Sequence, residues 1–152
     1  MSYGRYFEEF ETGAVYKHWP GRTINDYDNT WFALLSMNQN PLFIDEHYAR
    51  QQPLGKRPVM DTLIFSLLVG MTVADTSGKT IANLGFEIVT FEDPLFPGDS
   101  LYAESEVLDK RKSASKPDRG VIHMESRGFN QEGRRVAMLR RKFLAPKRPS
   151  HV

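Results

Sequence analysis

The chain has 152 residues and a mass of 17.5 kDa, which suits one domain extending over the whole sequence. With 40% hydrophobic and 26% charged residues, it has the composition of a water-soluble globular protein and not of a disordered one. The absence of cysteine excludes disulfides, thiolate nucleophiles and Cys-ligated metal sites. Residues 63–74 form the longest apolar stretch, which is shorter than the about 20 residues that span a bilayer. We therefore expect a cytoplasmic protein with no membrane partner.

The net charge of +1 hides an uneven distribution of charge along the chain. Residues 1–108 contain 7 Lys/Arg and 15 Asp/Glu, whereas residues 109–152 contain 13 Lys/Arg and 4 Asp/Glu. A basic end of this kind can meet the phosphates of a nucleotide-bearing ligand, an acidic partner or nucleic acid, or it can simply cover solvated strand faces. The basic residues form no recognisable nucleic-acid-binding pattern, so we expect no nucleic-acid partner.

The first half of the sequence predicts an extended lead-in followed by short helices. Aromatic residues are frequent before Pro20, and a helix is expected over residues 26–37, where Trp31, Leu34 and Leu35 share one face. Asn40-Pro41 ends that helix, because a residue before proline avoids the α region. Asp45 is expected to cap a second helix over residues 46–51.

The second half predicts one buried helix and four strands. Residues 61–76 are apolar at nearly every position after Asp61, which predicts a helix that begins at an Asp61 N-cap and is surrounded by protein on most sides. After Ser77-Gly78 the hydrophobic period changes from 3.6 to 2. Turn signals divide the rest into strands over residues 80–91, 100–110, 120–130 and 134–144. We expect an α+β fold in which an antiparallel sheet wraps around the helix, with open edges that dimerisation covers.

Several segments together resemble the MaoC-like dehydratases, the (R)-specific enoyl-CoA hydratases. The main segment is Asn38-Gln39-Asn40-Pro41-Leu42-Phe43-Ile44-Asp45 followed by Tyr48-Ala49, against a family signature Asp-x-Asn-Pro-Leu/Ile-His-x-Asp. The other matching segments, in chain order, are residues 6–13, 73–76, 81–86, 97–99 and 127–131. The likeness covers nearly the whole chain and is strongest to the mesaconyl-CoA hydratase-like branch. It implies a single hot-dog domain and an acyl-CoA ligand.

The resemblance also implies a chemistry, from which this chain departs at two positions. In the family an aspartate and a histidine add water across the double bond of an acyl-CoA thioester, and N–H groups at the start of the central helix polarise the carbonyl. The aspartate falls on Asn38, whose amide can orient water, and the histidine falls on Phe43, which cannot transfer a proton. Asn38 is therefore one candidate catalytic residue, and Asp61 is the other, because the resemblance places it at the entry to the central helix, next to the thioester. His47, one helical turn after Phe43, is a weaker candidate.

By the same resemblance, the residues expected to bind substrate are Asn40, Phe43, Met60 and Asn83. No pair of histidines has metal-ligand spacing, so we expect no metal and no cofactor beyond the CoA thioester itself. Three functions stay open at this point: an acyl-CoA hydratase/dehydratase, an acyl-CoA-binding or structural paralogue without turnover, and a hot-dog thioesterase that uses Asp61. A homodimer or a larger homo-oligomer is expected for each.

Overall fold

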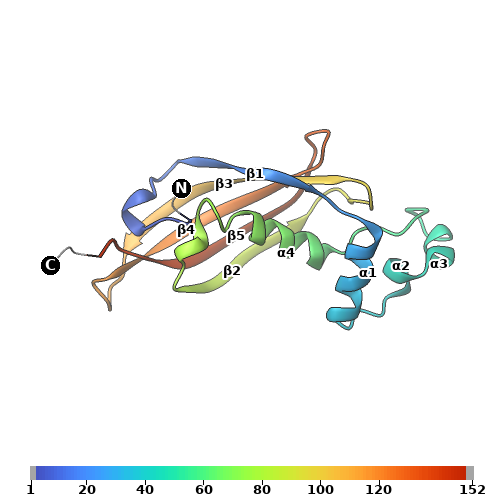
Figure 1. The fold of residues 1–152 in the computed structure, drawn as a ribbon, viewed down its shortest axis with the longest axis horizontal. Helices are drawn as coiled ribbons and strands as arrows, with labels where there is room; N and C mark the ends of the chain where they lie inside the picture. Colours follow the sequence, from blue (N-terminus) through green and yellow to red (C-terminus); the bar gives the residue numbers. More distant parts are fainter. Residues whose placement is uncertain (1–2, 150–152) are drawn as a thin grey trace.

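The computed structural model describes residues 3–149 and contains one antiparallel sheet with a helix along one face (Figure 1). The strand order is β1-β3-β4-β5-β2, so β1 and β2 are the edges. The elements are η1 (Phe7–Glu9), β1 (Val15–Thr23), α1 (Asp26–Leu35), α2 (Pro41–Ile44), α3 (Glu46–Arg50), α4 (Asp61–Met71), η2 (Ser77–Lys79), β2 (Ala82–Phe91), β3 (Ser100–Lys112), β4 (Arg119–Phe129) and β5 (Arg135–Pro146). The α+β class and the antiparallel sheet predicted from the sequence are confirmed.

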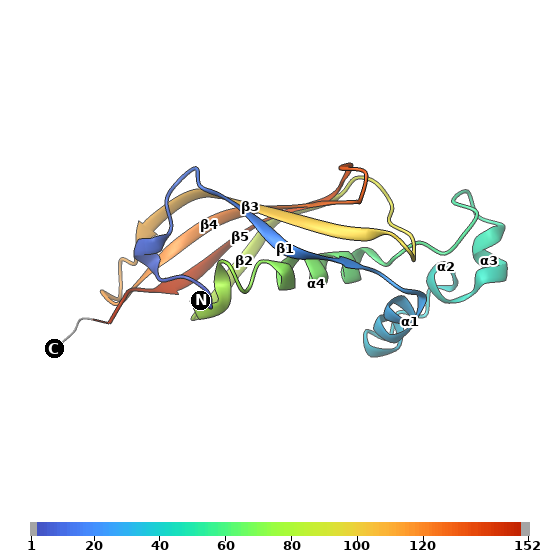
Figure 2. The same cartoon turned by 45° about the horizontal axis from the view of Figure 1, so that its top comes forward.

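The sheet curves over α4, and the main core lies between them (Figure 2). Leu63, Ile64 and Leu68 of α4 are buried against inward side chains of the sheet such as Leu101 and Leu139. The opposite side of α4 is open, since Thr62, Ser66 and Gly70 are exposed in the single chain. The sheet therefore encloses the helix from one side, and not from most sides as its apolar sequence predicts.

Two details of α4 differ from the sequence prediction. The N-cap is Met60 and not Asp61, which is the first residue of the helix. The helix ends at Met71 and not at Thr76, because Thr72 closes it as C-cap and the chain continues in turns. Candidate site residues lie at both ends of α4.

A fifth strand, β1, lies in the segment that the sequence predicts only as an extended lead-in. It pairs with β3 alone, and its register shifts between His18 and Arg22, around the Pro20-Gly21 pair. Its sequence lacks a clear inward–outward alternation because one side of this edge strand is largely exposed. Two of the aromatic residues before it, Phe7 and Phe10, are buried in a second small core beyond the end of α4.

The three short helices α1, α2 and α3 form an overhang beyond one end of the sheet (Figures 1 and 2). The apolar face predicted for α1 points away from the core of the chain, with Trp31, Leu34 and Leu35 exposed by 63%, 69% and 78%. The buried residues of α1 are Asn29 and Ala33. The hydrophobic pattern therefore identifies an unpartnered face, and the inner face carries a polar side chain.

The edge strand β2 is also largely unpartnered. It is hydrogen-bonded to β5 on one side, and nine of its ten residues are classed as exposed. The exposed apolar side chains on it are Leu84, Phe86, Ile88, Val89 and Phe91. A long apolar edge of this kind invites pairing with another chain.

The strand pairing brings the basic end of the chain against acidic residues from earlier segments. Arg127 lies among Glu104, Glu106 and Glu125 on the face of the sheet opposite α4. Further pairs of this kind are Arg135–Glu92, Arg140–Glu125, Lys142–Glu87 and Arg148–Glu9. Much of the charge asymmetry is therefore neutralised within the fold. Among residues 3–149, the structure has no helix with both the length and the apolar character needed to cross a membrane.

Candidate functional site at the ends of the central helix

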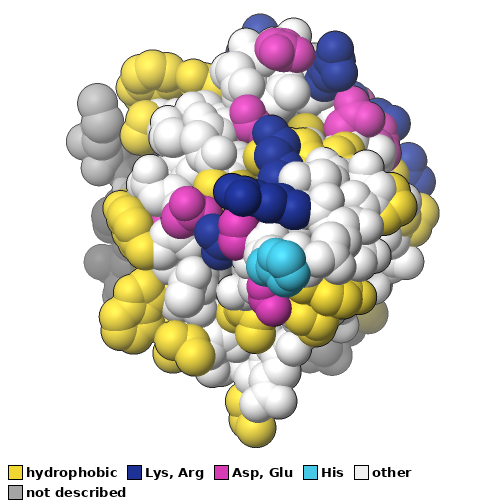
Figure 3. All heavy atoms as spheres, turned by 90° about the vertical axis from the view of Figure 1, so that its right-hand side faces the viewer, with side chains coloured by type: hydrophobic (Ala, Val, Ile, Leu, Met, Phe, Trp, Pro, Cys, Tyr) yellow, Lys and Arg dark blue, Asp and Glu magenta, His cyan; other side chains and the backbone are white. Residues whose placement is uncertain are grey.

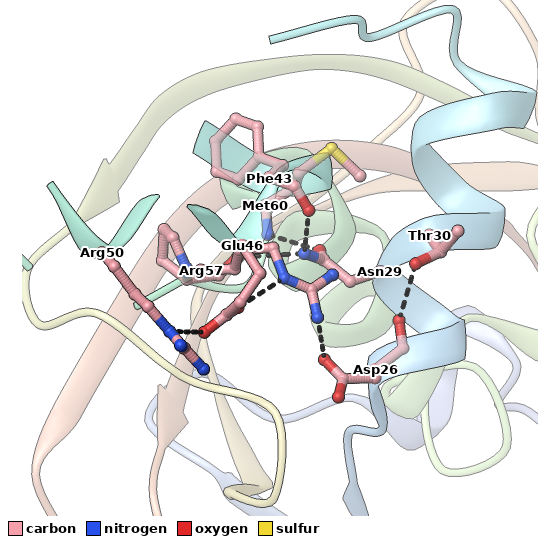
Figure 4. Close-up of polar contacts among 9 residues, drawn as sticks. Asp26, Asn29, Thr30, Phe43, Glu46, Arg50, Arg57 and Met60 are labelled. Atoms are coloured by element: carbon pink, nitrogen blue, oxygen red, sulfur yellow. Dashed lines mark hydrogen bonds and ion pairs between the residues drawn. The ribbon is translucent and has the colours of Figure 1, made fainter. Parts of the chain in front are cut away.

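The N-terminal end of α4 is held by one buried side chain, Asn29 of α1 (Figure 4). Its Oδ1 accepts a hydrogen bond from the backbone N–H of Met60 at 2.9 Å, and its Nδ2 donates to the carbonyl oxygen of Pro58 at 3.0 Å. A longer contact of 3.5 Å joins Nδ2 to the carbonyl oxygen of Phe43. One amide thus links the overhang to the start of the central helix.

Asn38 and Asn40 both shape the loop before α2. The Oδ1 of Asn38 accepts from the backbone N–H of Asn40 at 3.1 Å, and its Nδ2 points at the sulfur of Met60 at 3.2 Å. The Oδ1 of Asn40 accepts from the N–H of Leu42 and caps α2. The structure therefore brings Asn38 to the start of α4, whereas the amide oxygen of Asn40 is used within its own loop.

Phe43 and Met60 lie on the apolar side of this end of α4. Met60 is 1% exposed, and the partly buried Phe43 packs against the main core. A phenyl ring therefore occupies the position that the family signature gives to histidine, next to the start of the helix.

Asp61 and Thr62 open α4 and present free backbone donors. Neither N–H makes a hydrogen bond within residues 3–149, as is normal for the first residues of a helix. Partial burial raises the pKa of the Asp61 carboxyl above its usual value, although the residue keeps contact with solvent, and no ion pair among the described residues includes it. The end of α4 thus combines two free N–H groups, the positive end of the helix dipole and a carboxyl that binds its proton more tightly than usual.

Ion pairs fix the overhang helices to one another. The guanidinium of Arg57 donates to Glu46 of α3 at 2.8 Å and to Asp26 of α1 at 3.0 Å (Figure 4). Figure 3 shows this end of the molecule, where basic and acidic side chains gather together and hydrophobic ones lie around them. A cavity of about 370 Å³ lies here, lined by Asp26, Glu46, Lys56, Arg57, Phe96 and Pro97.

Among the described residues, the weaker catalytic candidate His47 has no hydrogen bond or ion pair with Asn38, Phe43 or Asp61. It lies exposed on α3, and its Nε2 is 3.0 Å from Nε2 of Gln51. Asp45 caps α3 by accepting from the N–H of Tyr48 at 3.0 Å, as predicted.

Asn83 lies at the other end of α4, so the chain does not bring it to Asn38 and Phe43. Its Oδ1 accepts from Nη1 of Arg141 at 3.0 Å, and Nη2 of Arg141 donates to Thr72 and Ser77, each at 3.0 Å. The sequence analysis does not single out Arg141, although the alternation of inward and outward residues in β5 indicates that its side chain is buried. Ala137, Leu139, Phe143 and Ala145 alternate as inward residues of β5, and Arg141 has the same parity.

An Asp-His-Ser arrangement with a buried histidine and a buried serine also occurs in the structure. Nδ1 of His18 is 2.9 Å from Oδ2 of Asp75, and Nε2 is 2.8 Å from Oγ of Ser105, which in turn lies 2.7 Å from Oγ of Ser126. Both serines are fully buried, so no substrate reaches them. The group joins β1 to the segment after α4 and to the sheet. Within the described residues, no three His, Asp or Glu side chains come together as metal ligands.

Comparison of this chain with known proteins identifies its family. The family model for mesaconyl-CoA hydratase matches residues 1–151. The chain belongs to the mesaconyl-CoA hydratase family. It is 32% identical over 145 residues to the mesaconyl-CoA hydratase of Cereibacter sphaeroides, covering 95% of this chain and 42% of that protein.

Solved structures agree with this assignment. A MaoC domain protein dehydratase from Chloroflexus aurantiacus superposes with a TM-score of 0.91 at 31% identity, over 96% of this chain and 41% of that one. A Mycobacterium tuberculosis protein described as a double hot-dog fold superposes with a TM-score of 0.86 over 98% of this chain and 46% of that one; at 22% identity it shows the fold alone. The hot-dog fold is confirmed, and the chain spans less than half the length of these relatives.

Proposed function

We propose that this chain is an acyl-CoA hydratase/dehydratase unit that binds an α,β-unsaturated CoA thioester at the N-terminal end of α4. The observation that carries the proposal is the pair of free N–H groups of Asp61 and Thr62, beside Asn38 and Phe43 at the position of the family signature. Two such donors stabilise the negative charge that develops on a thioester oxygen. The match to the mesaconyl-CoA hydratase family supports the same reaction.

In the hydration direction, the oxygen of water bonds to the β-carbon, a proton leaves that water, and a proton is added to the α-carbon. Asp61 is the titratable group at this end of α4, and its raised pKa suits a proton acceptor better than an ordinary carboxylate. The amide of Asn38 orients the water. With Phe43 in place of an imidazole, we expect a slow enzyme. Because the addition of water transfers no electrons, we expect no redox cofactor, and as in the sequence analysis we expect no metal and no cofactor beyond the CoA thioester itself.

We further propose that two copies associate through β2 around a two-fold axis. The exposed apolar side chains of β2, such as Ile88 and Val89, and the open side of α4 support this arrangement. Pairing of the two β2 strands joins the two sheets into one and covers the open β2 edge of each copy. Sedimentation at micromolar concentration is expected to show a dimer, and an Ile88→Lys variant is expected to sediment as a monomer. A monomeric wild type contradicts this association. The cytoplasmic location stays a prediction.

A second candidate function, thioester hydrolysis, is favoured by the unpaired carboxyl of Asp61. One experiment separates the two. The purified chain is incubated with crotonyl-CoA and butyryl-CoA, while loss of the enoyl-thioester absorbance and release of free thiol are followed. The proposed function predicts slow hydration of crotonyl-CoA without thiol release. Thiol release from both substrates identifies a thioesterase, and binding without either product identifies a non-catalytic paralogue.

A further inference from the structure

Arg57 connects three elements around the N-terminal end of α4 (Figure 4). Its Nη2 donates to Asp26, the first residue of α1, at 3.0 Å, and its Nε donates to Glu46, the first residue of α3, at 2.8 Å. Arg57 itself lies in the segment that leads into α4, three residues before the N-cap Met60. Within residues 3–149, no other ion pair links α1 or α3 to this segment.

The overhang has little apolar core of its own to hold it in place. The structure buries no residue of α2 and only Ala49 of α3. In α1 the buried residues are Asn29 and Ala33, and the first of these is polar. Polar contacts therefore contribute much of what fixes the overhang relative to α4.

The loop that carries Asn38 and Phe43 lies between the two helices that Arg57 holds. Residues 36–45 run from the end of α1 to the start of α3 and include α2. At the near side of this loop, Nδ2 of Asn38 lies 3.2 Å from the sulfur of Met60, at the start of α4. A shift of α1 or α3 relative to α4 therefore moves the amide of Asn38 away from the free N–H groups of the helix.

The shape and the charge of Arg57 suit it to hold two helices at once. Its side chain is 18% exposed, and its planar guanidinium offers separate N–H groups to the two carboxylates. The hydrogen bond from Arg57 holds the pKa of the Glu46 carboxyl below its ordinary value, so this carboxyl is ionised at neutral pH. Because the carboxylates of Asp26 and Glu46 stay in contact with water, their ion pairs add little to the free energy of unfolding. An effect of Arg57 on the position of the loop can therefore be measured apart from an effect on stability.

We propose that Arg57 is a positioning residue for hydration, whose two ion pairs hold the amide of Asn38 at the start of α4, where it orients the attacking water. The inference rests on the proposed function. Arg57 acts through Asn38 and not by contact with the substrate. Its loss therefore lowers the rate of the chemical step and leaves the affinity for the thioester nearly unchanged.

Steady-state kinetics of the full chain with crotonyl-CoA test this. Arg57→Gln is expected to lower kcat by about 10²-fold, the effect of a misplacement of about 1 Å, with KM nearly unchanged. Arg57→Lys keeps the charge but not the planar fork, so it is expected to recover part of kcat. Arg50→Gln is the matched control, because it removes another cation that pairs with Glu46, but from within α3, and it is expected to keep the full kcat.

NMR spectra of the ¹⁵N-labelled full chain supply a readout that needs no turnover. The N–H of Asn40 donates to Oδ1 of Asn38 at 3.1 Å, so its signal and that of the Asn38 side-chain amide report the position of the loop. Both signals are expected to shift in Arg57→Gln, whereas the backbone signal of Ile122, in the core of the sheet, stays in place. If Arg57→Gln does not fold, Glu46→Gln and Asp26→Asn each remove one ion pair and are expected to show smaller effects of the same sign.

A kcat of Arg57→Gln equal to that of the wild type overturns the inference. A raised KM with an unchanged kcat also overturns it, because the guanidinium then binds the thioester itself. Unchanged Asn38 and Asn40 signals contradict the positioning role, and a shift of Ile122 as well shows a general structural role instead. If the wild type does not hydrate crotonyl-CoA, the proposed function fails, and the Asn38 and Asn40 signals still decide whether Arg57 holds this amide.

Discussion

The two ends of α4 differ in the burial and the hydrogen bonding of the charged side chain that lies there. At the N-terminal end, Asp61 is partly exposed and two backbone N–H groups have no acceptor within residues 3–149. At the C-terminal end, Arg141 is buried and hydrogen-bonded to hydroxyl and amide oxygens. Each charge lies at the pole of the helix dipole that favours it. The difference indicates that the N-terminal end, with its free donors, suits chemistry on a carbonyl group, whereas the C-terminal end is closed by hydrogen bonds within the chain.

At the N-terminal end, the largest change in hydration rate is expected from restoring the imidazole that the family signature contains. Phe43→His places a group that accepts and returns protons near neutral pH beside the α4 donors. Hydration of crotonyl-CoA is expected to rise by about 10²–10⁴-fold, measured as loss of the enoyl-thioester absorbance. Phe43→Leu is the control for a simple change of packing. A wild type that already works at the rate of Phe43→His contradicts the assignment of Phe43 to the histidine position.

Removing the carboxylate at the same end is expected to have the next largest effect. Asp61→Asn keeps the size and polarity of the side chain but cannot accept a proton, so the hydration rate is expected to fall by about 10²-fold. Because partial burial raises the pKa of Asp61, the wild-type rate is expected to decrease as the pH falls through a pKa higher than the ordinary value for aspartate. The pH profile of kcat/KM in Asp61→Asn lacks that decrease. An unchanged profile assigns the base to another group.

The link between the overhang and α4 is tested through stability. Asn29→Ala leaves the N–H of Met60 and the carbonyl of Pro58 buried without partners. The free energy of unfolding, measured in urea, is expected to fall by about 2–3 kcal/mol. Thr30→Ala, on an exposed position of the same helix, is the control and is expected to have a small effect. If the free energy of unfolding falls only slightly in Asn29→Ala, then apolar contacts, and not this amide, hold α1 to the start of α4.

The sheet could be predicted from the sequence more completely than the site. The strands over residues 82–91, 100–112, 119–129 and 135–146 alternate in hydrophobicity between clear turn signals. The sequence does not predict β1, because an edge strand interrupted by Pro20-Gly21 shows no such alternation. The cap by Asp45 was predictable because it depends only on neighbouring residues.

The site depends on contacts between distant segments, which local patterns do not record. Asn29 faces inward while its apolar neighbours on α1 face outward, and only the position of the overhang beyond the sheet decides this. The resemblance predicts that Asn83 and Asn38 act on the same substrate, whereas the chain puts them at opposite ends of α4. Arg141 was hidden in the run Arg140-Arg141-Lys142, whose outer members pair with glutamates.

The central claim is that the thioester carbonyl binds the start of α4. The most direct measurement is an NMR titration of the ¹⁵N-labelled chain with butyryl-CoA, following the backbone amides of Asp61 and Thr62. Both amide signals are expected to shift and saturate together, because their N–H groups gain an acceptor. Binding that leaves these two amides unchanged and shifts signals elsewhere contradicts the claim.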